Sequence, residues 1–473
     1  MQNNPNEIQT LKAKIEEQNA TIKEQGEKIA QLEAEITELR RRLGLNSTNS
    51  NKPPSSDGYK KKTIAPAIPK NKRPKGGQKG HKGKTLERVE NPDYVVLHLP
   101  QTCQCCGRTF SANDQHEVVQ NRQVFDLPPP KLEVTEHRVG EICCCGVAQR
   151  GEFPPEVTAT VQYGPRVRAL TTMLSVDHKM PMDQINQLFN NIYGCDLNSS
   201  TVIGALNEAS EKAAPFEAAT KQDILKSDVT NFDETGIRIA GKLYWLHTAS
   251  TADSTYLFVS KKRGMEALES EASVIKDFTG TAVHDCWKSY FKFDKSRHVL
   301  CGAHLLRELN GLKECGSVWA GEMHGFMLRL YAVVSSPVMA NEMRKCDAEE
   351  IREHYRSILN QADIEEPLPD YSKRKRPKQT VGRNLLDRLR LYEDGVLAFA
   401  FEEAVPFTNN QAERDLRGAK VKQKVSGCFR TVEGANVYAR LQAGISTVRK
   451  RGGSVFNWLC DLFSPKKAGE GGR

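Results

Sequence analysis

The chain has 473 residues, of which 38% are hydrophobic and 27% are charged, so it holds enough apolar material for packed cores in two to four domains. No apolar run approaches the roughly 18 residues that a membrane span needs, and the first residues lack the apolar stretch of a signal peptide. These features argue against a membrane protein and a secreted one, and we expect a cytoplasmic protein.

Lysine and arginine exceed aspartate and glutamate by 68 to 59, a net charge of +9. The surplus is local, because residues 60–90 contain eleven Lys or Arg and two Glu. A basic arm on a near-neutral body indicates a polyanionic partner, most simply nucleic acid. The alternative is a solvated linker without a partner.

The N-terminal segment has a heptad pattern that predicts a coiled coil over residues 1–45. One seam position is taken by Ile8, Ile15, Ile22, Ile29, Ile36 and Leu43, and the other by Leu11, Leu32 and Leu39, with Gln18 and Gln25 as polar interruptions. Isoleucine and leucine in this arrangement favour two strands, and hence a homodimer or higher oligomer. The alternative is a helix packed on its own domain.

Residues 46–92 are predicted to be a linker. Its first part is rich in Asn, Ser and Pro and offers almost nothing to bury. Its second part, KNKRPKGGQKGHKGK, combines glycines that let backbone approach phosphate with basic residues that neutralise it. The predicted DNA-binding residues here are Lys72, Arg73, Lys75, Lys79, Lys82 and Lys84.

Of the 13 cysteines, six lie between Cys103 and Cys145. An odd total without a signal peptide argues against a disulfide framework. Cys103-x-x-Cys106 has the spacing that puts two thiolates on one metal ion, and Cys143 with Cys145 offers a second pair. We therefore predict a small structural Zn²⁺ domain over residues 93–154, with adventitious thiols as the alternative. Which cysteines bind stays open, and His98, His116 or His137 are substitute ligands.

Residues 155–222 are predicted to be a helical DNA-binding domain. Its segment 180–210 is predicted to form two helices joined by a turn at Gly194, which is the arrangement of a helix-turn-helix motif. A plain helical hairpin explains the pattern equally well.

From residue 223 the pattern turns to strands. Three strands are expected between residues 227 and 261, the first two meeting near Thr235-Gly236, with turns around Gly241 and Ala252. A helix over 264–278 and two further strands follow. This order resembles the ribonuclease-H-like α/β fold. We assign residues 223–465 to that core, with a helical insertion at about 305–400 and a disordered tail at 466–473.

Three acidic residues lie at the positions of this pattern from which a ribonuclease-H-like core presents its acids. Asp233 ends the first predicted strand, Asp285 ends the strand TAVHD, and Glu413 lies in the first turn of a helix that begins at Asn409-Asn410. Carboxylates converging from separate elements suit two divalent ions in phosphodiester chemistry. Singly, each has an ordinary explanation, since Asn410-x-x-Glu413 is also a capping box and the two aspartates also fit strand ends and turns.

Taken together, these segments resemble the large transposases of the insertion sequence 66 group. The resemblance rests on LGLNSTNSNKPPSSDG, GGQKGHKG, the cysteine pairs, Asp233-Glu234-Thr235, HDCWKSY, CGAHLLREL and NNQAERDLR, in this order. It implies a DDE transposase that cuts and rejoins DNA at the ends of its own element, in the bacterial cytoplasm at the nucleoid. Asp233, Asp285 and Glu413 would bind two Mg²⁺ or Mn²⁺ ions. Its partners would be terminal inverted repeats and target DNA, with small accessory proteins of the same element left open.

Two further features have competing explanations. Cys301-x-x-His304 has metal-binding spacing but no second pair nearby, so a buried thiol and a histidine at a helix start compete with an accessory role at the scissile phosphate. Arg414 and Arg417 are candidates for phosphate contacts, although Arg417 also has the spacing to pair with Glu413. The competing functions are a non-catalytic DNA-binding regulator derived from a transposase and a coiled-coil assembly protein.

Overall fold

The computed structural model describes residues 5–46, 49–50, 85–111, 113–345, 348–369, 372 and 378–464. The six basic residues predicted to bind DNA between Lys72 and Lys84 lie outside the described residues, as does the tail at 466–473.

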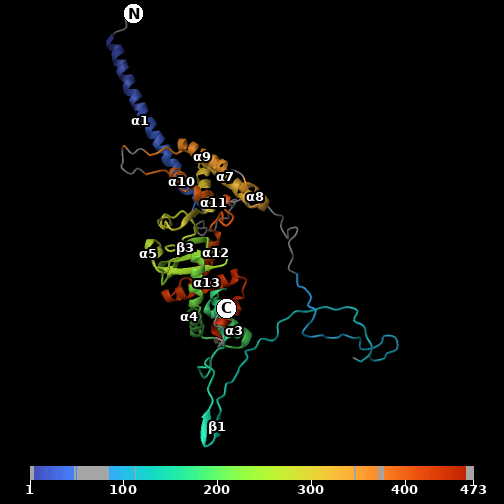
Figure 1. The fold of residues 1–473 in the computed structure, drawn as a ribbon. Coiled ribbons are helices and arrows are strands. Elements are labelled where there is room, and N and C mark those ends of the chain that lie inside the picture. Colours follow the sequence, from blue (N-terminus) through green and yellow to red (C-terminus); the bar gives the residue numbers. More distant parts are fainter. Residues whose placement is uncertain are drawn as a thin grey trace.

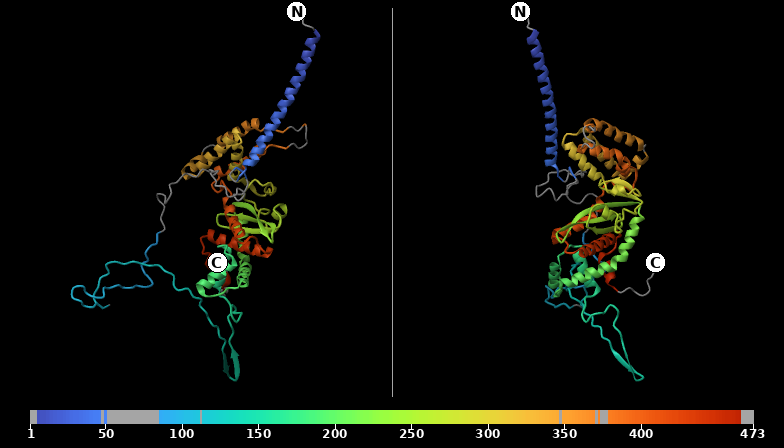
Figure 2. Two further views of the ribbon diagram at one scale, coloured as in Figure 1. Left: turned by 180° about the vertical axis from the view of Figure 1, so that it is seen from behind. Right: turned by 90° about the vertical axis from the view of Figure 1, so that its left-hand side faces the viewer.

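The N-terminal segment is one continuous helix, α1 (Pro5–Gly44), which confirms the helix predicted there. It projects away from the rest of the chain (Figures 1 and 2). Its seam residues Ile15, Ile22 and Ile29 are 55%, 64% and 57% exposed. An exposed apolar seam on a single helix is the surface that pairing of two coils would cover, and that pairing stays a prediction.

The larger sheet is mixed and has the strand order β5-β4-β3-β6-β7. β3 pairs antiparallel with β4 and parallel with β6, while β4 and β5 are antiparallel and β6 and β7 parallel. The strands are β3 (Val229–Ile239), β4 (Lys242–Ser250), β5 (Thr255–Ser260), β6 (Thr281–His284) and β7 (Arg297–Leu300). A short 3₁₀ turn (Tyr290–Lys292) lies between β6 and β7.

Two groups of helices surround this sheet (Figure 1). After β7 the chain enters a helical insertion, which ends where α12 returns to the sheet. Its helices are α6 (Gly302–Glu314), α7 (Val318–Val334), α8 (Pro337–Lys345), α9 (Ala348–Glu365), α10 (Val381–Leu391) and α11 (Glu393–Phe401). The second group is α2 (Pro165–Val176), α3 (Met182–Tyr193), α4 (Ser199–Leu225), α12 (Asn410–Ser426), α13 (Val432–Lys450) and α14 (Val455–Phe463).

Strand alternation divides the buried side chains between two faces of the sheet. Ile237, Leu246 and Leu257 pack in one core with helices α2, α4, α12, α13 and α14. Phe232 and Ala249 lie on the opposite face, in a second core. The insertion has its own core, which meets the sheet at β6 and β7.

The predicted turn at Gly194 between two helices is confirmed, with Gly194 in the left-handed region at φ 62°. α3 and the start of α4 share a small core of their own around Ile185, Phe189, Leu197 and Val202. α2 and the rest of α4 also pack with α13 and α14. α4 is also long, and it carries the chain directly to the sheet.

Two expectations about the sheet region were wrong. The chain does not break at Thr235-Gly236, because β3 runs unbroken through both residues and the first hairpin turns at Ala240-Gly241. Gly236 remains extended, and Leu243 of the paired strand lies 3.1 Å from where a Cβ would be. The glycine therefore makes room for a neighbour and does not end the strand. The second error is the helix over 264–278, of which only α5 (Met265–Leu268) is helical.

The Asn-, Ser- and Pro-rich first part of the predicted linker was expected to bury almost nothing. One of its residues, Asn49, is 7% exposed and bonds to the insertion, a contact treated below. In the part of the chain that the structure describes, no helix combines the length and apolar character needed to cross a bilayer.

Candidate active site

The two predicted aspartates lie on neighbouring parallel strands. Asn231 of β3 pairs with Val283 of β6, so Asp233 and Asp285 each follow the last paired position by two residues. Asp233 lies inside β3 rather than at its end, and Asp285 directly follows β6. Because side chains two apart on a strand share a face, this register directs both carboxylates to the same side of the sheet.

Glu413 reaches this side from the first turn of α12, as predicted. The start of α12 is tied to the sheet by Asn409, which is 1% exposed. Its side-chain amide donates to the Phe232 carbonyl at 2.7 Å and accepts from the Asn231 amide at 2.9 Å. The helix N-cap therefore bonds β3 instead of closing a capping box, and this contact sets the position of Glu413.

A second set of contacts holds α12 two residues further along. Asp415 is 9% exposed and accepts from Lys450 Nζ of α13 at 2.8 Å. It also accepts from the hydroxyls of Ser250, Thr255 and Ser446. Asp415 thus joins α12 to β4, β5 and α13, and its charge is matched by a buried ammonium.

The charges of Asp285 and Glu413 both act on Asp233. Burial raises the pKa of Asp233 well above its ordinary value, and the negative charges of Glu234, Asp285 and Glu413 raise it further. Burial and the charge of Glu234 raise the pKa of Asp285 to about 6, against the opposing effects of the Trp287 N–H and of Arg263. The site therefore concentrates negative charge that few protein cations offset.

Glu234 was not predicted to have a role, and it acts on the other face of the sheet. Strand alternation turns it away from Asp233, and its side chain is only 1% exposed. It accepts from Arg263 Nε at 2.7 Å and from the Tyr290 hydroxyl at 2.6 Å. The Arg263 guanidinium lies over the ring of Trp287, 4.4 Å from its centroid. Glu234 thereby ties β3 to the loop that carries Asp285.

Cys301 and His304 flank the site at the start of α6. Cys301 is fully buried, precedes the helix as its N-cap, and its sulfur accepts from the Asn409 N–H at 3.2 Å. Burial raises the pKa of the Cys301 thiol to about 11 and lowers the pKa of His304 to about 4. The neutral thiol and imidazole fit the structural explanation of this motif. His304 Nδ1 is buried, and no partner for it lies among the described residues.

The insertion also contributes an ion pair within electrostatic reach of Asp285, and no local sequence pattern predicts it. Arg388 of α10 donates from Nη2 to Glu308 of α6 at 2.5 Å, and both side chains are mostly buried. Glu308 is one of the charges that raise the pKa of Asp285. These residues are 80 positions apart in the chain, so only the packing of α10 on α6 reveals the contact.

The basic residues predicted on α12 are exposed. Arg414 donates to Gln411 at 2.7 Å, and Arg417 lies on the surface. In the described ranges no ion pair joins Arg417 to Glu413, so the pairing considered from their spacing is not formed. Both guanidinium groups remain accessible beside Glu413.

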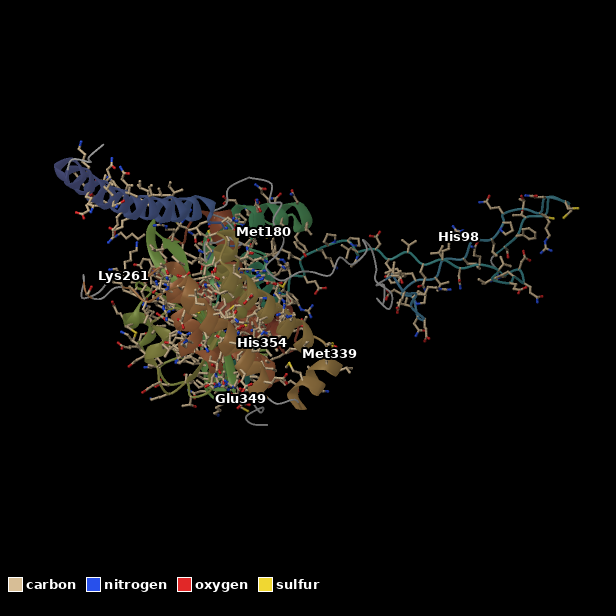
Figure 3. The ribbon with its side chains drawn as sticks, turned by 90° about the horizontal axis from the view of Figure 1, so that it is seen from above. His98, Met180, Lys261, Met339, Glu349 and His354 are labelled. Atoms are coloured by element: carbon tan, nitrogen blue, oxygen red, sulfur yellow. The ribbon has the colours of Figure 1, made fainter. Side chains whose placement is uncertain are left out.

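The cysteine pairs lie in separate parts of the chain. Cys103 begins a tight turn closed by Gly107, where the backbone of Cys106 lowers the pKa of the Cys103 thiol. Cys143 lies in the hairpin formed by β1 (Glu141–Cys144) and β2 (Val147–Arg150). The extended stretch around His98 runs far from the helical body (Figure 3). Zinc binding by Cys103, Cys106, Cys143 and Cys145 therefore stays a prediction.

Among the described residues, no three or more His, Cys, Asp or Glu side chains are grouped closely enough to surround a metal ion. This holds for the cysteines and for the acids. The acids lie within electrostatic reach of one another, and a cation would have to draw them closer.

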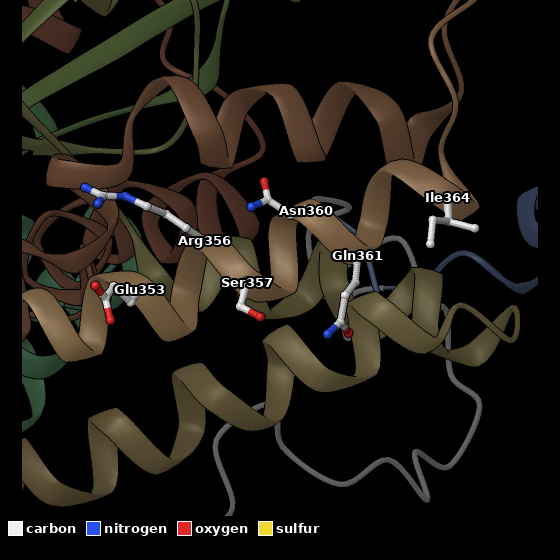
Figure 4. A pocket seen from close by; sticks show the side chains of 6 residues that line it. All are labelled: Glu353, Arg356, Ser357, Asn360, Gln361 and Ile364. Atoms are coloured by element: carbon white, nitrogen blue, oxygen red, sulfur yellow. The ribbon is translucent and has the colours of Figure 1, made fainter.

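The surface of the insertion has a shallow hollow of about 470 Å³ along α9. Its lining is polar apart from one isoleucine (Figure 4) and consists of Glu353, Arg356, Ser357, Asn360, Gln361 and Ile364. None of these residues contacts the acidic site, and we assign the hollow no role.

Comparison with known families adds two matches. Residues 160–437, more than half of the chain, match the model of the family described as "Transposase IS66 family". Residues 2–87 match a family of unknown function (DUF6444), which covers the coil and the basic arm. No curated protein sequence matches the chain.

Proposed function

The chain belongs to the IS66 family of transposases, and from this membership we propose that it cleaves and rejoins DNA at the ends of its own insertion sequence with Asp233, Asp285 and Glu413 as its catalytic acids. The observation that carries the proposal is the electrostatic convergence of these three carboxylates from β3, β6 and α12. The strand order β5-β4-β3-β6-β7, with Asp233 within β3 and Asp285 directly after the parallel strand β6, supports a ribonuclease-H-like core.

The acids fit divalent metal ions by the chemistry of their donors. All three offer hard oxygen ligands. Burial, and then neighbouring negative charge, raises the pKa values of Asp233 and Asp285, and a bound cation would offset both effects. Asp233, Asp285 and Glu413 would hold two Mg²⁺ or Mn²⁺ ions. When bound, such ions activate the attacking oxygen and stabilise the charge on the leaving one.

The reaction has two steps. In the first, a water oxygen bonds to the phosphorus at the element's end and the 3′ oxygen of that strand leaves. In the second, the freed 3′-hydroxyl attacks a phosphate of the target DNA, and a target oxygen leaves.

The chain's own residues keep the three acids in place for these steps. Asn409 and Asp415 fix α12 on the sheet, so they are positioning residues for Glu413. Glu234 holds the loop after β6 through Tyr290, so it positions Asp285.

DNA would be held by basic surface outside the acids. Arg414 and Arg417 lie on the exposed side of α12, one and four residues after Glu413, where they would meet the phosphates that flank the scissile bond. The basic arm at residues 60–90 would supply sequence-independent attraction. Pairing of two α1 helices would bring two DNA ends together, since each end needs its own set of acids.

The test is cleavage of labelled element ends in the presence of Mg²⁺. Asp233→Asn, Asp285→Asn and Glu413→Gln should each abolish cleavage and leave DNA binding nearly intact, because each removes ligand charge. Asp294→Asn is a matched control at an exposed acid in the loop after β6, and it should cleave normally. Cleavage that persists in a variant removes that residue from the site. Wild-type protein that binds ends and never cleaves them would favour the non-catalytic regulator.

A further inference from the structure

The chain just beyond α1 folds into a closed turn. The Asn46 N–H donates to the side-chain oxygen of Asn49 at 2.7 Å, and the Ser50 hydroxyl donates to the Asn46 carbonyl at 2.5 Å. Only Leu45 separates this turn from the last residue of α1. Because the turn begins so close to the end of α1, whatever holds the turn also restricts the direction of α1.

The turn is docked on the last turn of α6. The side-chain amide of Asn49 donates to Glu314 Oε2 at 2.6 Å, while the other oxygen of Glu314 accepts from Asn310 at 2.9 Å. Asn49 is 7% exposed, although its neighbours in sequence are polar. A buried asparagine with its amide on a carboxylate is a specific contact rather than a chance approach.

An independent observation supports the same contact. A Cβ at Gly311 of α6 would lie 2.5 Å from the Asn49 carbonyl oxygen, which is closer than real Cβ atoms approach. Glycine is a poor helix former, so its presence in the last turn of α6 has a cost that this close backbone approach explains. The other two atoms nearest to that Cβ position, the carbonyl carbon and the Cβ of Asn49, lie at 3.5 Å and 3.7 Å.

α6 connects this docking point to the acids. Its first turn follows Cys301, whose sulfur accepts from the N–H of Asn409, and Asn409 sets the position of Glu413. A single helix thus has the end of α1 at its C-terminus and the acidic site at its N-terminus.

We propose that Asn46, Asn49 and Ser50 form an anchor that fixes α1 to α6, so that pairing of two α1 helices sets the spacing of two acidic sites. The partner surface is the C-terminal turn of α6, with Gly311 and Glu314. The consequence for paired DNA ends depends on the proposed function, whereas the anchor contact itself does not.

The contact is tested first without DNA, by hydrogen exchange in the full-length protein. Gly311→Ala should raise the exchange rate of the amides of Asn46, Asn49 and Ser50 by roughly tenfold or more, because the added methyl expels Asn49 while α6 itself gains a better helix former. Gly321→Ala in α7 is the matched control, since its Cβ would meet only the Lys313 side chain at 3.7 Å and 3.8 Å. Unchanged exchange of these three amides in Gly311→Ala would overturn the anchor.

A second variant removes the polar contact and leaves the glycine. Asn49→Ala should raise exchange of the same amides, and combining it with Gly311→Ala should add little, because both act on one contact. Fully additive effects would contradict a shared contact.

A functional experiment compares the cleavage of single DNA ends with the concerted transfer of paired DNA ends. Gly311→Ala should keep cleavage of one end and lose concerted transfer of two ends by roughly tenfold or more, with the dimer intact in sedimentation. Normal paired-end transfer would overturn the spacing role even where exchange confirms the contact. If wild-type protein cleaves no DNA, the proposed function fails and the exchange result still decides the anchor.

Discussion

Replacing Asp415 by alanine should destabilise the protein by about 3–5 kcal/mol, because it leaves a buried ammonium without its counter-ion. Lys450 is 11% exposed, and without Asp415 the hydrogen bonds left to it among the described residues are those to Ser250 and to the carbonyls of Thr251 and Ser254. Those three neutral acceptors do not offset the desolvated charge. The loss should appear in urea unfolding as a lower midpoint with an unchanged slope.

The sign of the pH dependence follows from the same ion pair. Burial on its own would raise the pKa of Asp415, but Lys450 and the surrounding hydroxyls lower it overall. A carboxyl with a lowered pKa stabilises the fold above its ordinary pKa, and this contribution is lost as the pH falls through the folded value. Wild type and Asp415→Ala should therefore differ most near neutral pH and converge in acid.

Two further variants distinguish the loss of the ion pair from a nonspecific effect of substitution on stability. Asp461→Ala, at an exposed acid on α14, should change stability by no more than about 0.5 kcal/mol. Asp415→Leu combined with Lys450→Met removes both charges, and it should be more stable than Asp415→Ala by at least about 1 kcal/mol.

The functional consequence concerns α12. Asp415 lies two residues after Glu413, so losing it should loosen the helix that presents this proposed catalytic acid and lower the cleavage rate more than DNA affinity. A cost below about 1 kcal/mol for Asp415→Ala, or a double variant no better than the single one, would refute the reasoning.

Four other predictions concern single positions. Gly302→Ala should destabilise the protein by about 1–3 kcal/mol, because its Cβ would lie 2.2 Å from a buried phenylalanine ring, whereas Gly204→Ala, with open space around its Cβ, should be neutral or stabilising in the same unfolding assay. The pKa of Asp285 is raised to about 6, so its contribution to stability is present below the ordinary carboxyl pKa and is lost as the pH rises through about 6; Mg²⁺ should then raise the Tm at pH 7 and not at pH 4. Glu234→Gln removes a charge that raises the pKa of Asp285, so the ascending limb of the cleavage pH–rate profile should move to lower pH, and an unmoved limb would contradict this coupling. Cys103→Ser should abolish zinc uptake measured by elemental analysis after metal-replete expression, and equal zinc in wild type and variant would count against Cys103 as a ligand.

Local patterns were enough to predict the helices and strands that carry the acids. The apolar seam over residues 7–43 predicted α1, and period-two alternation with turn residues predicted the hairpins at Gly241 and Ala252. Asp285 and Glu413 lie where these patterns placed them, directly after a strand and in a first helical turn. Such features depend on residues within one or two turns of each other, and the sequence contains that information directly.

The local patterns failed where a distant neighbour decided the outcome. Gly236 was predicted to lie at a break between two strands, but its pairing with β4 keeps β3 extended. Asn49 lies in a segment with almost nothing apolar to bury, and it becomes buried because Gly311, far along the chain, leaves room for its backbone.

The sequence was sufficient to predict most of the helices and strands, the three candidate acids and the family resemblance. The residues that hold those acids in place became known from the packing of distant segments. The side chain of Asn409 bonds to β3 and does not cap its own helix, and Glu234 faces away from Asp233. Arg388 reaches Glu308 from a helix 80 positions away. Each contact joins segments that no local periodicity relates, so it forms only when the packed helices and the sheet register bring its two sides together.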